Sequence, residues 1–229
     1  MKEEEIIKEA EEIDEHIKTH GHDVKKERGP LWYILAVLLA LMVVAMVVPY
    51  YGIKLDPEPK YIATIDEVLP NEFEIENISR SINKKQDFLR FLNPSDVVVK
   101  QVADRVVSKS GCGNNRVCYS KALFYFVKDN FYYINDPPDE YIKTSRETLK
   151  SGGGDCDDNS VLLANLLQSI GISTRFTFVP RHVYVEAYLP DAIGRHKRDG
   201  DWVVLDSTCE YCEFGDLSIK GANQKRIYI

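Results

Sequence analysis

Cys156 is the residue whose surroundings are best suited to nucleophilic chemistry. It follows three glycines at positions 152–154, and apolar residues with helical spacing continue from Val161 to Ile170, before Gly171. This spacing predicts a helix that begins at or just before Cys156 and ends at Gly171. The unpaired N–H groups and the dipole at a helix N-terminus favour a thiolate over a thiol. The competing interpretation is a capped core helix that happens to carry a cysteine.

A histidine and an aspartate further along the chain are placed to act with this cysteine. Residues 182–189 (HVYVEAYL) and 201–206 (DWVVLD) alternate in character and are rich in β-branched and aromatic residues, which predicts two strands. His182 opens the first strand and Asp206 closes the second, so antiparallel pairing would bring them close. A nucleophile needs a base within hydrogen-bond reach, and that base needs an orienting partner. The two residues and Cys156 meet this requirement, although each alone also has an ordinary structural explanation.

Three acidic residues flank the cysteine in the sequence, namely Asp155, Asp157 and Asp158. Their charges oppose a thiolate at Cys156, whereas the helix terminus and a protonated His182 favour one. We predict a thiolate that depends on His182. The acidic residues themselves could cap the helix, select basic substrates or only hold the turn.

The other four cysteines form two close pairs, Cys112 with Cys118 and Cys209 with Cys212. Two pairs and one leftover cysteine are typical of a disulfide-bearing extracytoplasmic enzyme with a free nucleophile. A zinc site with four thiolate ligands is the alternative, because two close pairs suit it equally. The spacing leaves open whether disulfides would form within or between the pairs. No cofactor is predicted.

A long apolar segment lies near the N-terminus. Residues 31–48 contain no charge, and tryptophan and tyrosine residues flank both ends. This length can span a bilayer, and aromatic residues are enriched at membrane interfaces. An uncleaved anchor is favoured over a cleaved signal peptide, because only a poor cleavage site follows. More lysine and arginine residues precede the segment than follow it closely, so we expect the N-terminus in the cytoplasm.

These features divide the chain into four parts. Residues 1–30 form a charged cytoplasmic tail, and residues 31–51 form the transmembrane helix. Residues 52–94 form a linker and helical segment, and residues 95–229 form the large domain, outside the cytoplasm. The formal net charge of −7 at pH 7 does not suggest a nucleic-acid partner.

Helical patterns come before strand patterns in the large domain and in the segment that precedes it. The predicted helices cover most of residues 61–110, then residues 117–130 and a short stretch starting at Thr144 or Ser145. The predicted strands are residues 131–135, 173–179, 182–189 and 201–206, with residues 194–201 as a hairpin connection. Helices first and strands after predict an α+β fold.

Three segments in this order, GDCDDNSVLLANLLQSIGISTRF, HVYVEAYL and WVVLDST, resemble the transglutaminase-like superfamily of cysteine enzymes. The residues that fit the family pattern, within about residues 95–215, are Cys156, Ser160, Arg175, His182, Glu186, Asp206 and Thr208. The resemblance implies a papain-like α+β core in which Cys156 is the nucleophile, His182 the base and Asp206 the residue that orients His182. The backbone N–H of Cys156 is the first candidate oxyanion donor, with residues 131–134 as its neighbours.

The resulting expectation is a membrane-anchored cysteine hydrolase that acts on peptide or protein amide bonds through an acyl-enzyme. Its partners would be a peptide or protein substrate and the membrane, while the sequence does not indicate an oligomeric state. Two alternatives remain open. The same triad could transfer the acyl group to an amine and so cross-link proteins, or the fold could serve as a non-catalytic extracytoplasmic binding module.

Overall fold

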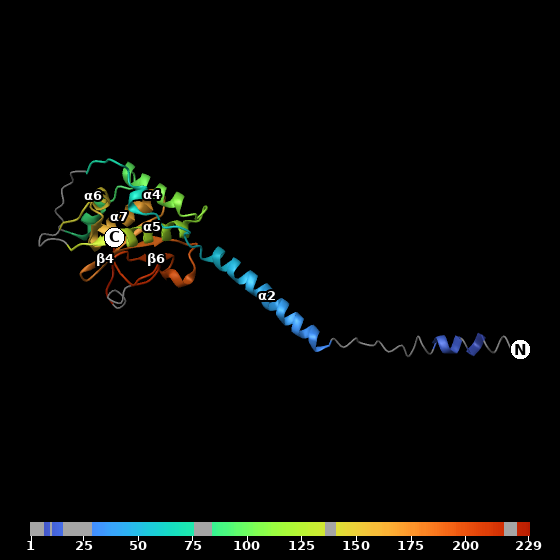
Figure 1. Cartoon of the computed structure of the whole chain (residues 1–229). Helices are drawn as coiled ribbons and strands as arrows, with labels where there is room; N and C mark the ends of the chain where they lie inside the picture. Colours follow the sequence, from blue (N-terminus) through green and yellow to red (C-terminus); the bar gives the residue numbers. More distant parts are fainter. Residues whose placement is uncertain (1–6, 10, 16–28, 76–83, 136–140, 218–223) are drawn as a thin grey trace. The chain divides into compact units, whose positions relative to one another are not determined.

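The computed structural model of the chain describes residues 7–9, 11–15, 29–75, 84–135, 141–217 and 224–229. They belong to two compact units, Met1–Pro49 and Tyr50–Ile229. In the larger unit the helices come first along the chain and an antiparallel sheet follows, so the predicted α+β class is confirmed (Figure 1). The assignment of residues 1–30 to the cytoplasm stays a prediction, and so do the other domain boundaries.

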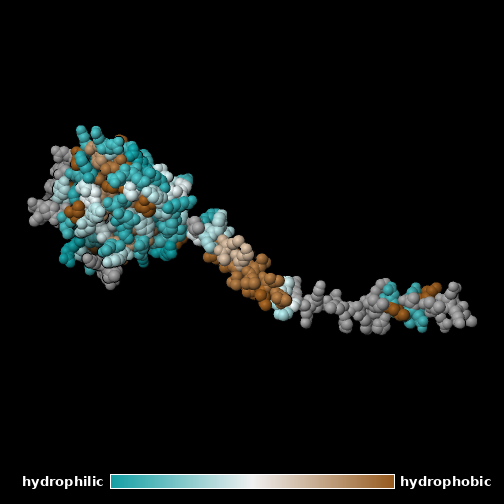
Figure 2. Space-filling model, viewed as in Figure 1, coloured by the Kyte–Doolittle hydropathy of each residue, from teal (hydrophilic) through white to brown (hydrophobic). Residues whose placement is uncertain are grey.

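Helix α2 (Pro30–Leu55) is the apolar segment near the N-terminus. Its part Pro30–Gly52 is long and apolar enough to cross a membrane, and none of it is buried inside the protein. Figure 2 shows this apolar surface along the helix. Exposed apolar area is unfavourable in water by about 25 cal/mol per Å², which a lipid surrounding would remove. A signal sequence would form the same helix, so α2 is a signal or an anchor.

Helix α7 (Cys156–Ser169) lies at the centre of the larger unit. Its apolar residues Val161, Leu162, Leu163, Leu166 and Leu167 are all buried. The elements packed around it are α4 (Val97–Lys109), α5 (Arg116–Asn130), α6 (Ser145–Ser151), β3 (Thr174–Val179) and β4 (His182–Tyr188). The predicted start at Cys156 and the end at Gly171, where φ is +80°, are both confirmed.

The sheet has the strand order β5-β6-β4-β3-β7, and every neighbouring pair is antiparallel. Its strands are β3 (Thr174–Val179), β4 (His182–Tyr188), β5 (Lys197–Asp199), β6 (Trp202–Leu205) and β7 (Ile227–Tyr228). Alternate side chains of β4, Val183, Val185 and Ala187, are buried in the main core together with α7. The register pairs Glu186 with Val204, which sets where β4 begins relative to where β6 ends.

Two short strands of this sheet were not predicted. Residues 194–201, expected as a hairpin connection, contain a 3-10 helix at Gly194–His196, then β5 and a tight turn at Gly200 with φ of +60°. Strand β7 at the C-terminus pairs with β3. The Arg175 guanidinium lies between the rings of Trp202 and Tyr228, at 4.3 and 3.9 Å from their centroids. Edge strands this short are fixed by tertiary contacts and leave little signal in sequence.

The prediction that residues 61–110 are mostly helical holds only for α4 and is wrong for the described residues before it. They contain one helical turn at Ile65–Val68 and a 3-10 helix at Lys85–Phe91, and residues 76–83 lie outside the described part. Val68, Phe88 and Phe91 are buried in the main core. Their burial depends on contact with α4, α7 and the sheet, not on a helical face of their own. This segment therefore packs on the core.

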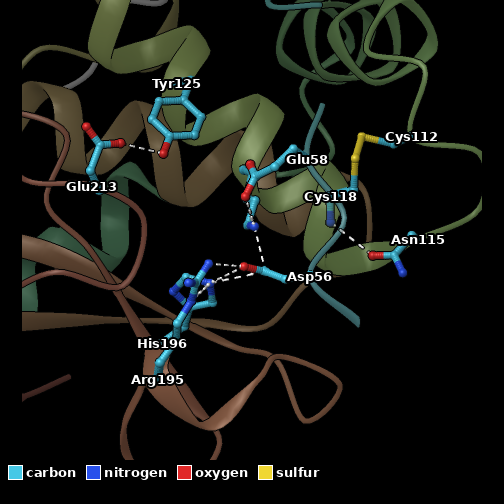
Figure 3. A network of polar contacts seen from close by, with 10 residues as sticks. Asp56, Glu58, Cys112, Asn115, Cys118, Tyr125, Arg195, His196 and Glu213 are labelled. Carbon is cyan, nitrogen blue, oxygen red and sulfur yellow. Dashed lines mark hydrogen bonds and ion pairs between the residues drawn. A yellow bond between two sulfur atoms is a disulfide. The ribbon is translucent and has the colours of Figure 1, made fainter. Parts of the chain in front are cut away.

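A buried ion-pair network fixes the chain where it leaves α2 (Figure 3). The Nζ of Lys121, with only 1% of its side chain exposed, lies 2.6 Å from a carboxylate oxygen of Asp56 and 2.5 Å from one of Glu58. Asp56 also pairs with His196 at 3.0 Å and with Arg195. Burial alone would raise the pKa of Asp56, but the hydrogen bonds from Lys121 and His196 hold it below its ordinary value.

Candidate active site

The glycines before Cys156 form a turn that no larger residue would fit. Gly152 ends α6 in the left-handed conformation, with φ of +66°. A Cβ on Gly153 would lie 2.6 Å from the carbonyl oxygen of Tyr132, and one on Gly154 would lie 2.5 Å from Oδ2 of Asp158. The close approach exists because Gly153–Gly154 (β2) pairs in parallel with Tyr132–Tyr133 (β1). Of the strand predicted at residues 131–135, only Tyr132–Tyr133 forms one, beside the cysteine turn.

Two of the three acidic neighbours of Cys156 have structural roles. Asp155 is the N-cap of α7 and accepts hydrogen bonds from the backbone N–H groups of Asp157 and Asp158. Asp158 is fully buried and pairs with the Nζ of Lys143 at 2.5 Å. The Lys143 backbone N–H also donates to Asp158, at 2.7 Å. Sequence reasoning did not single out Lys143, since its partner lies 15 residues away across two turns.

The thiol of Cys156 is the free sulfhydryl of the described chain, and it is partly buried. Its Sγ lies 3.3 Å from Oδ1 of Asp157, which accepts a hydrogen bond from the S–H group. Burial raises the pKa of Cys156 most, and the charges of Asp157 and Asp155 raise it further; the backbone N–H of Val183, which donates to Sγ, acts in the opposite direction. The resting side chain is therefore a thiol. The predicted dependence of a thiolate on His182 stays a prediction.

His182 and Asp206 meet at the end of the sheet, as the sequence predicts. Nε2 of His182 lies 2.8 Å from Oδ2 of Asp206, whose side chain is only 1% exposed. Thr208 donates to the other oxygen, Oδ1, at 3.2 Å. Because the buried carboxylate is an acceptor, the imidazole donates its Nε2–H there, which leaves Nδ1 for another partner.

The N-terminal end of α7 meets the beginning of β4. The backbone N–H of Val183, one residue after His182, lowers the pKa of the Cys156 thiol. Ser160, four residues into α7, donates to the carbonyl oxygen of Val183 at 3.2 Å. Among the described residues there is no hydrogen bond between Sγ and the His182 imidazole. Such bonds are often long in structures without a substrate. Sequence reasoning missed Val183 because a backbone donor carries no side-chain signature.

Both close pairs of cysteines form disulfides, Cys112 with Cys118 and Cys209 with Cys212. The connectivity left open by the sequence is thus within the pairs, and the thiolates of the zinc alternative are oxidised in this structure. Disulfides persist in oxidising compartments. Together with the one apolar helix of spanning length that the described residues contain, they indicate an extracytoplasmic domain.

The arrangement defines a class of protein: an α+β domain with a free cysteine at a helix N-terminus beside a histidine–aspartate pair. Residues 100–207 match the family model described as the transglutaminase-like superfamily, and this range contains all three residues. The chain thus carries a transglutaminase-like core. A search of curated proteins gave no match.

Three solved structures are similar to the chain. A putative cysteine protease from Cytophaga hutchinsonii is 23% identical, with 56% of this chain and 44% of that chain covered, at a TM-score of 0.36. A putative protease from Parabacteroides distasonis is 16% identical, with 52% and 24% covered, at 0.39. Legionella pneumophila LapG is 16% identical, with 75% and 85% covered, at 0.42. The chain thus spans less than half of the first two proteins, and similarities at these TM-scores carry no argument about activity.

Proposed function

We propose that this protein is a cysteine hydrolase that cleaves peptide or protein amide bonds, with Cys156 as nucleophile, His182 as base and Asp206 as the residue that orients His182. The observation that carries the proposal is the 2.8 Å contact between Nε2 of His182 and the buried Asp206. It holds the imidazole so that Nδ1 remains available, on the residue before Val183, whose backbone N–H lowers the pKa of the Cys156 thiol. A nucleophile, a base and an orienting acid are the parts that acyl transfer requires.

The reaction follows from these positions. Nδ1 of His182 takes the proton of the Cys156 thiol as Sγ attacks the amide carbonyl, and the carbonyl oxygen becomes an oxyanion. The backbone N–H of Cys156 lies in the first turn of α7, where Asp155 occupies the N–H groups of Asp157 and Asp158. It is the candidate donor to the oxyanion. His182 returns the proton to the leaving amine, and water then hydrolyses the thioester.

The charge distribution favours removal of the proton during attack over a preformed thiolate. Burial and Asp157 raise the pKa of Cys156, so at neutral pH the thiol keeps its proton until a base accepts it. Asp206 stabilises the imidazolium that results, because its carboxylate remains charged 2.8 Å away. The catalytic contribution of His182 should therefore be large.

We further propose that α2 is an uncleaved membrane anchor with the N-terminal residues in the cytoplasm. Its exposed apolar surface and its flanking aromatic residues support this. The domain Tyr50–Ile229 would then act on peptides or proteins outside the cytoplasm. Detection of α2 in the mature protein by mass spectrometry would support the anchor, and a mature N-terminus beyond Gly52 would refute it.

The proposal is tested on the full chain in detergent with iodoacetamide and with a library of peptide amides. We expect alkylation of Cys156 at neutral pH to slow at least tenfold in His182→Ala and in Asp206→Asn, and peptide hydrolysis to be lost in Cys156→Ala. Asp191→Asn, at an exposed aspartate, is the control and should change neither. Alkylation that is indifferent to His182→Ala would refute the pairing.

The same assay separates hydrolysis from acyl transfer. Both reactions share the acyl-enzyme and differ in whether water or an amine reaches it. We expect a labelled primary amine to be incorporated into peptide substrates more slowly than they are hydrolysed. Faster incorporation would establish the protein as an acyltransferase.

A further inference from the structure

Asp206 lies beyond the last residue of its strand and depends on a loop for its position. Strand β6 ends at Leu205, and the next hydrogen bond back to it is from the N–H of Gly215 to the carbonyl of Val204. The intervening chain has no helix or strand. Because Asp206 must hold His182, the geometry of this loop bears directly on the site.

The disulfide of this loop lies against the Asp206 carboxylate. A carboxylate oxygen of Asp206 and the Sγ atoms of Cys209 and Cys212 all lie within 4.8 Å of one another. The backbone N–H of Cys209 donates to the carbonyl of Asp206 at 3.3 Å, and that of Cys212 donates to the carbonyl of Cys209 at 3.2 Å. The ring of four residues closed by the disulfide therefore begins where the Asp206 turn ends.

The far side of the loop is fixed to α5. The Nζ of Lys128 donates to the carbonyl of Cys212 at 2.6 Å. The hydroxyl of Tyr125 donates to Glu213 at 2.6 Å, as Figure 3 shows. The tip of the loop is exposed, and the exposed fraction of Tyr211 is 87%. The disulfide thus cross-links the part of the loop that follows Asp206 to the part that α5 holds, in addition to the backbone between them.

We infer that the Cys209–Cys212 disulfide is a positioning element for Asp206, so that the reactivity of Cys156 depends on its oxidation. The inference rests on the proposed function of Cys156, His182 and Asp206. When the disulfide is intact, the Asp206 carboxylate stays 2.8 Å from Nε2 of His182. When it is opened, the exposed tip can move, and the hydrogen bond that fixes the imidazole weakens.

The chemical step is reduction by a dithiol. The dithiol gives two electrons and two protons to the Cys209–Cys212 bond, which becomes two thiols, and the reductant becomes a cyclic disulfide. One sulfur is in reach, because Cys209 is partly exposed whereas Cys212 is buried. No bond at Cys156 changes in this step.

The second disulfide is a matched control. Cys112 is partly exposed and Cys118 buried, as in the first pair, and the described contacts of Cys112 and Cys118 involve none of the three site residues. It closes a larger ring, with a sequence separation of 6 against 3. Since the entropy of loop closure grows with ring size, its removal should destabilise the protein at least as much. If lost stability alone changed the alkylation rate of Cys156, removal of the control disulfide should therefore change that rate more.

The experiment uses the full chain in detergent and follows carbamidomethylation of Cys156 by iodoacetamide, with the modified peptide quantified by mass spectrometry across pH. We expect C209A/C212A to slow alkylation at neutral pH about tenfold or more, toward the rate of His182→Ala. C112A/C118A should stay within about twofold of the wild type. Reduction with dithiothreitol, which is removed before iodoacetamide is added, should slow the wild type and C112A/C118A and leave C209A/C212A unchanged.

Unfolding of the domain would change the alkylation rate of Cys156 in the opposite direction. It would release Cys156 from burial and from Asp157, which raise its pKa, and so it would speed alkylation. Equal slowing in both double variants, or normal reactivity in C209A/C212A, would overturn the inference.

A second readout does not depend on reactivity. In Cys156→Ala, NMR should show a low-field resonance for the Nε2–H of His182, absent in Asp206→Asn. We expect C209A/C212A to lose this resonance and C112A/C118A to keep it. If the resonance behaves in this way but alkylation ignores His182, the positioning stands and the proposed function fails. If C209A/C212A keeps the resonance, the positioning fails.

Discussion

Asp157 is the acidic residue that most directly opposes ionisation of the Cys156 thiol, and its neutralisation tests how the nucleophile is activated. Asp157→Asn keeps the size of the side chain and removes the charge. Sγ lies 3.3 Å from Oδ1 of Asp157, so a thiolate there would face a full negative charge at contact distance. We expect the substitution to lower the pKa of Cys156 and to raise the thiolate fraction at neutral pH.

The size of the effect follows from the distance and the surroundings. Two unit charges at 4 Å interact by about 4 kcal/mol at the effective dielectric constant near a protein surface. Both side chains are partly exposed, so solvent and rearrangement reduce this to about a third, or about 1.4 kcal/mol. That energy corresponds to about a tenfold change in the thiolate fraction.

The assay is the rate of Cys156 alkylation by iodoacetamide between pH 6 and pH 9, measured in a His182→Ala background so that the base does not contribute. We expect Asp157→Asn to be about tenfold faster throughout this range, because the rate follows the thiolate fraction. Asp191→Asn in the same background is the control and should leave the rate unchanged. An unchanged or slower rate in Asp157→Asn would refute the electrostatic reasoning. An alkylation rate of wild-type Cys156 that does not change with pH below pH 7 would refute it too, because Cys156 would then already be a thiolate.

Lys121→Met should destabilise the protein by about 2–4 kcal/mol at pH 7 in urea unfolding, because it takes the buried cation away from the partly buried Asp56. The pKa of Asp56 is lowered in the folded protein, so its contribution exists above the unfolded pKa of about 3.9 and is lost as the pH falls further. The destabilisation caused by Lys121→Met should be smaller at pH 3 than at pH 7, and an equal destabilisation at both pH values would contradict this. Gly154→Ala should cost about 1–3 kcal/mol, since the new Cβ meets the buried Asp158, whereas Gly194→Ala, with open space around it, should cost little by the same measurement.

Local patterns in the sequence predicted a large part of the fold. The apolar spacing and Asp155 placed the start of α7 at Cys156, because helix periodicity and capping are properties of neighbouring residues. Alternation placed β4 and β6, and with them His182 at one strand's start and Asp206 at the other strand's end. The cysteine count singled out Cys156 as the free thiol.

Elements that depend on distant partners were not predictable in this way. The residues before α4 read as helix from their composition, yet Val68 and Phe88 are buried by packing on the core. The edge strand β7 exists because β3 offers it hydrogen bonds and Arg175 stacks on its Tyr228. Lys121 appeared as an ordinary helix residue, and only the fold brings Asp56 to it over 65 positions.

For the candidate site, too, some features follow from the sequence and others only from the tertiary structure. The sequence by itself determined which residues are proposed to carry its chemistry, since a thiol at a helix start, an imidazole and a carboxylate are recognisable from type and local pattern. The state of the thiol was decided by the tertiary structure. Burial and the position of the Asp157 carboxylate keep Cys156 protonated, against the thiolate that a helix terminus alone would favour. Desolvation and charge separation are distances in space, and a one-dimensional sequence does not contain them.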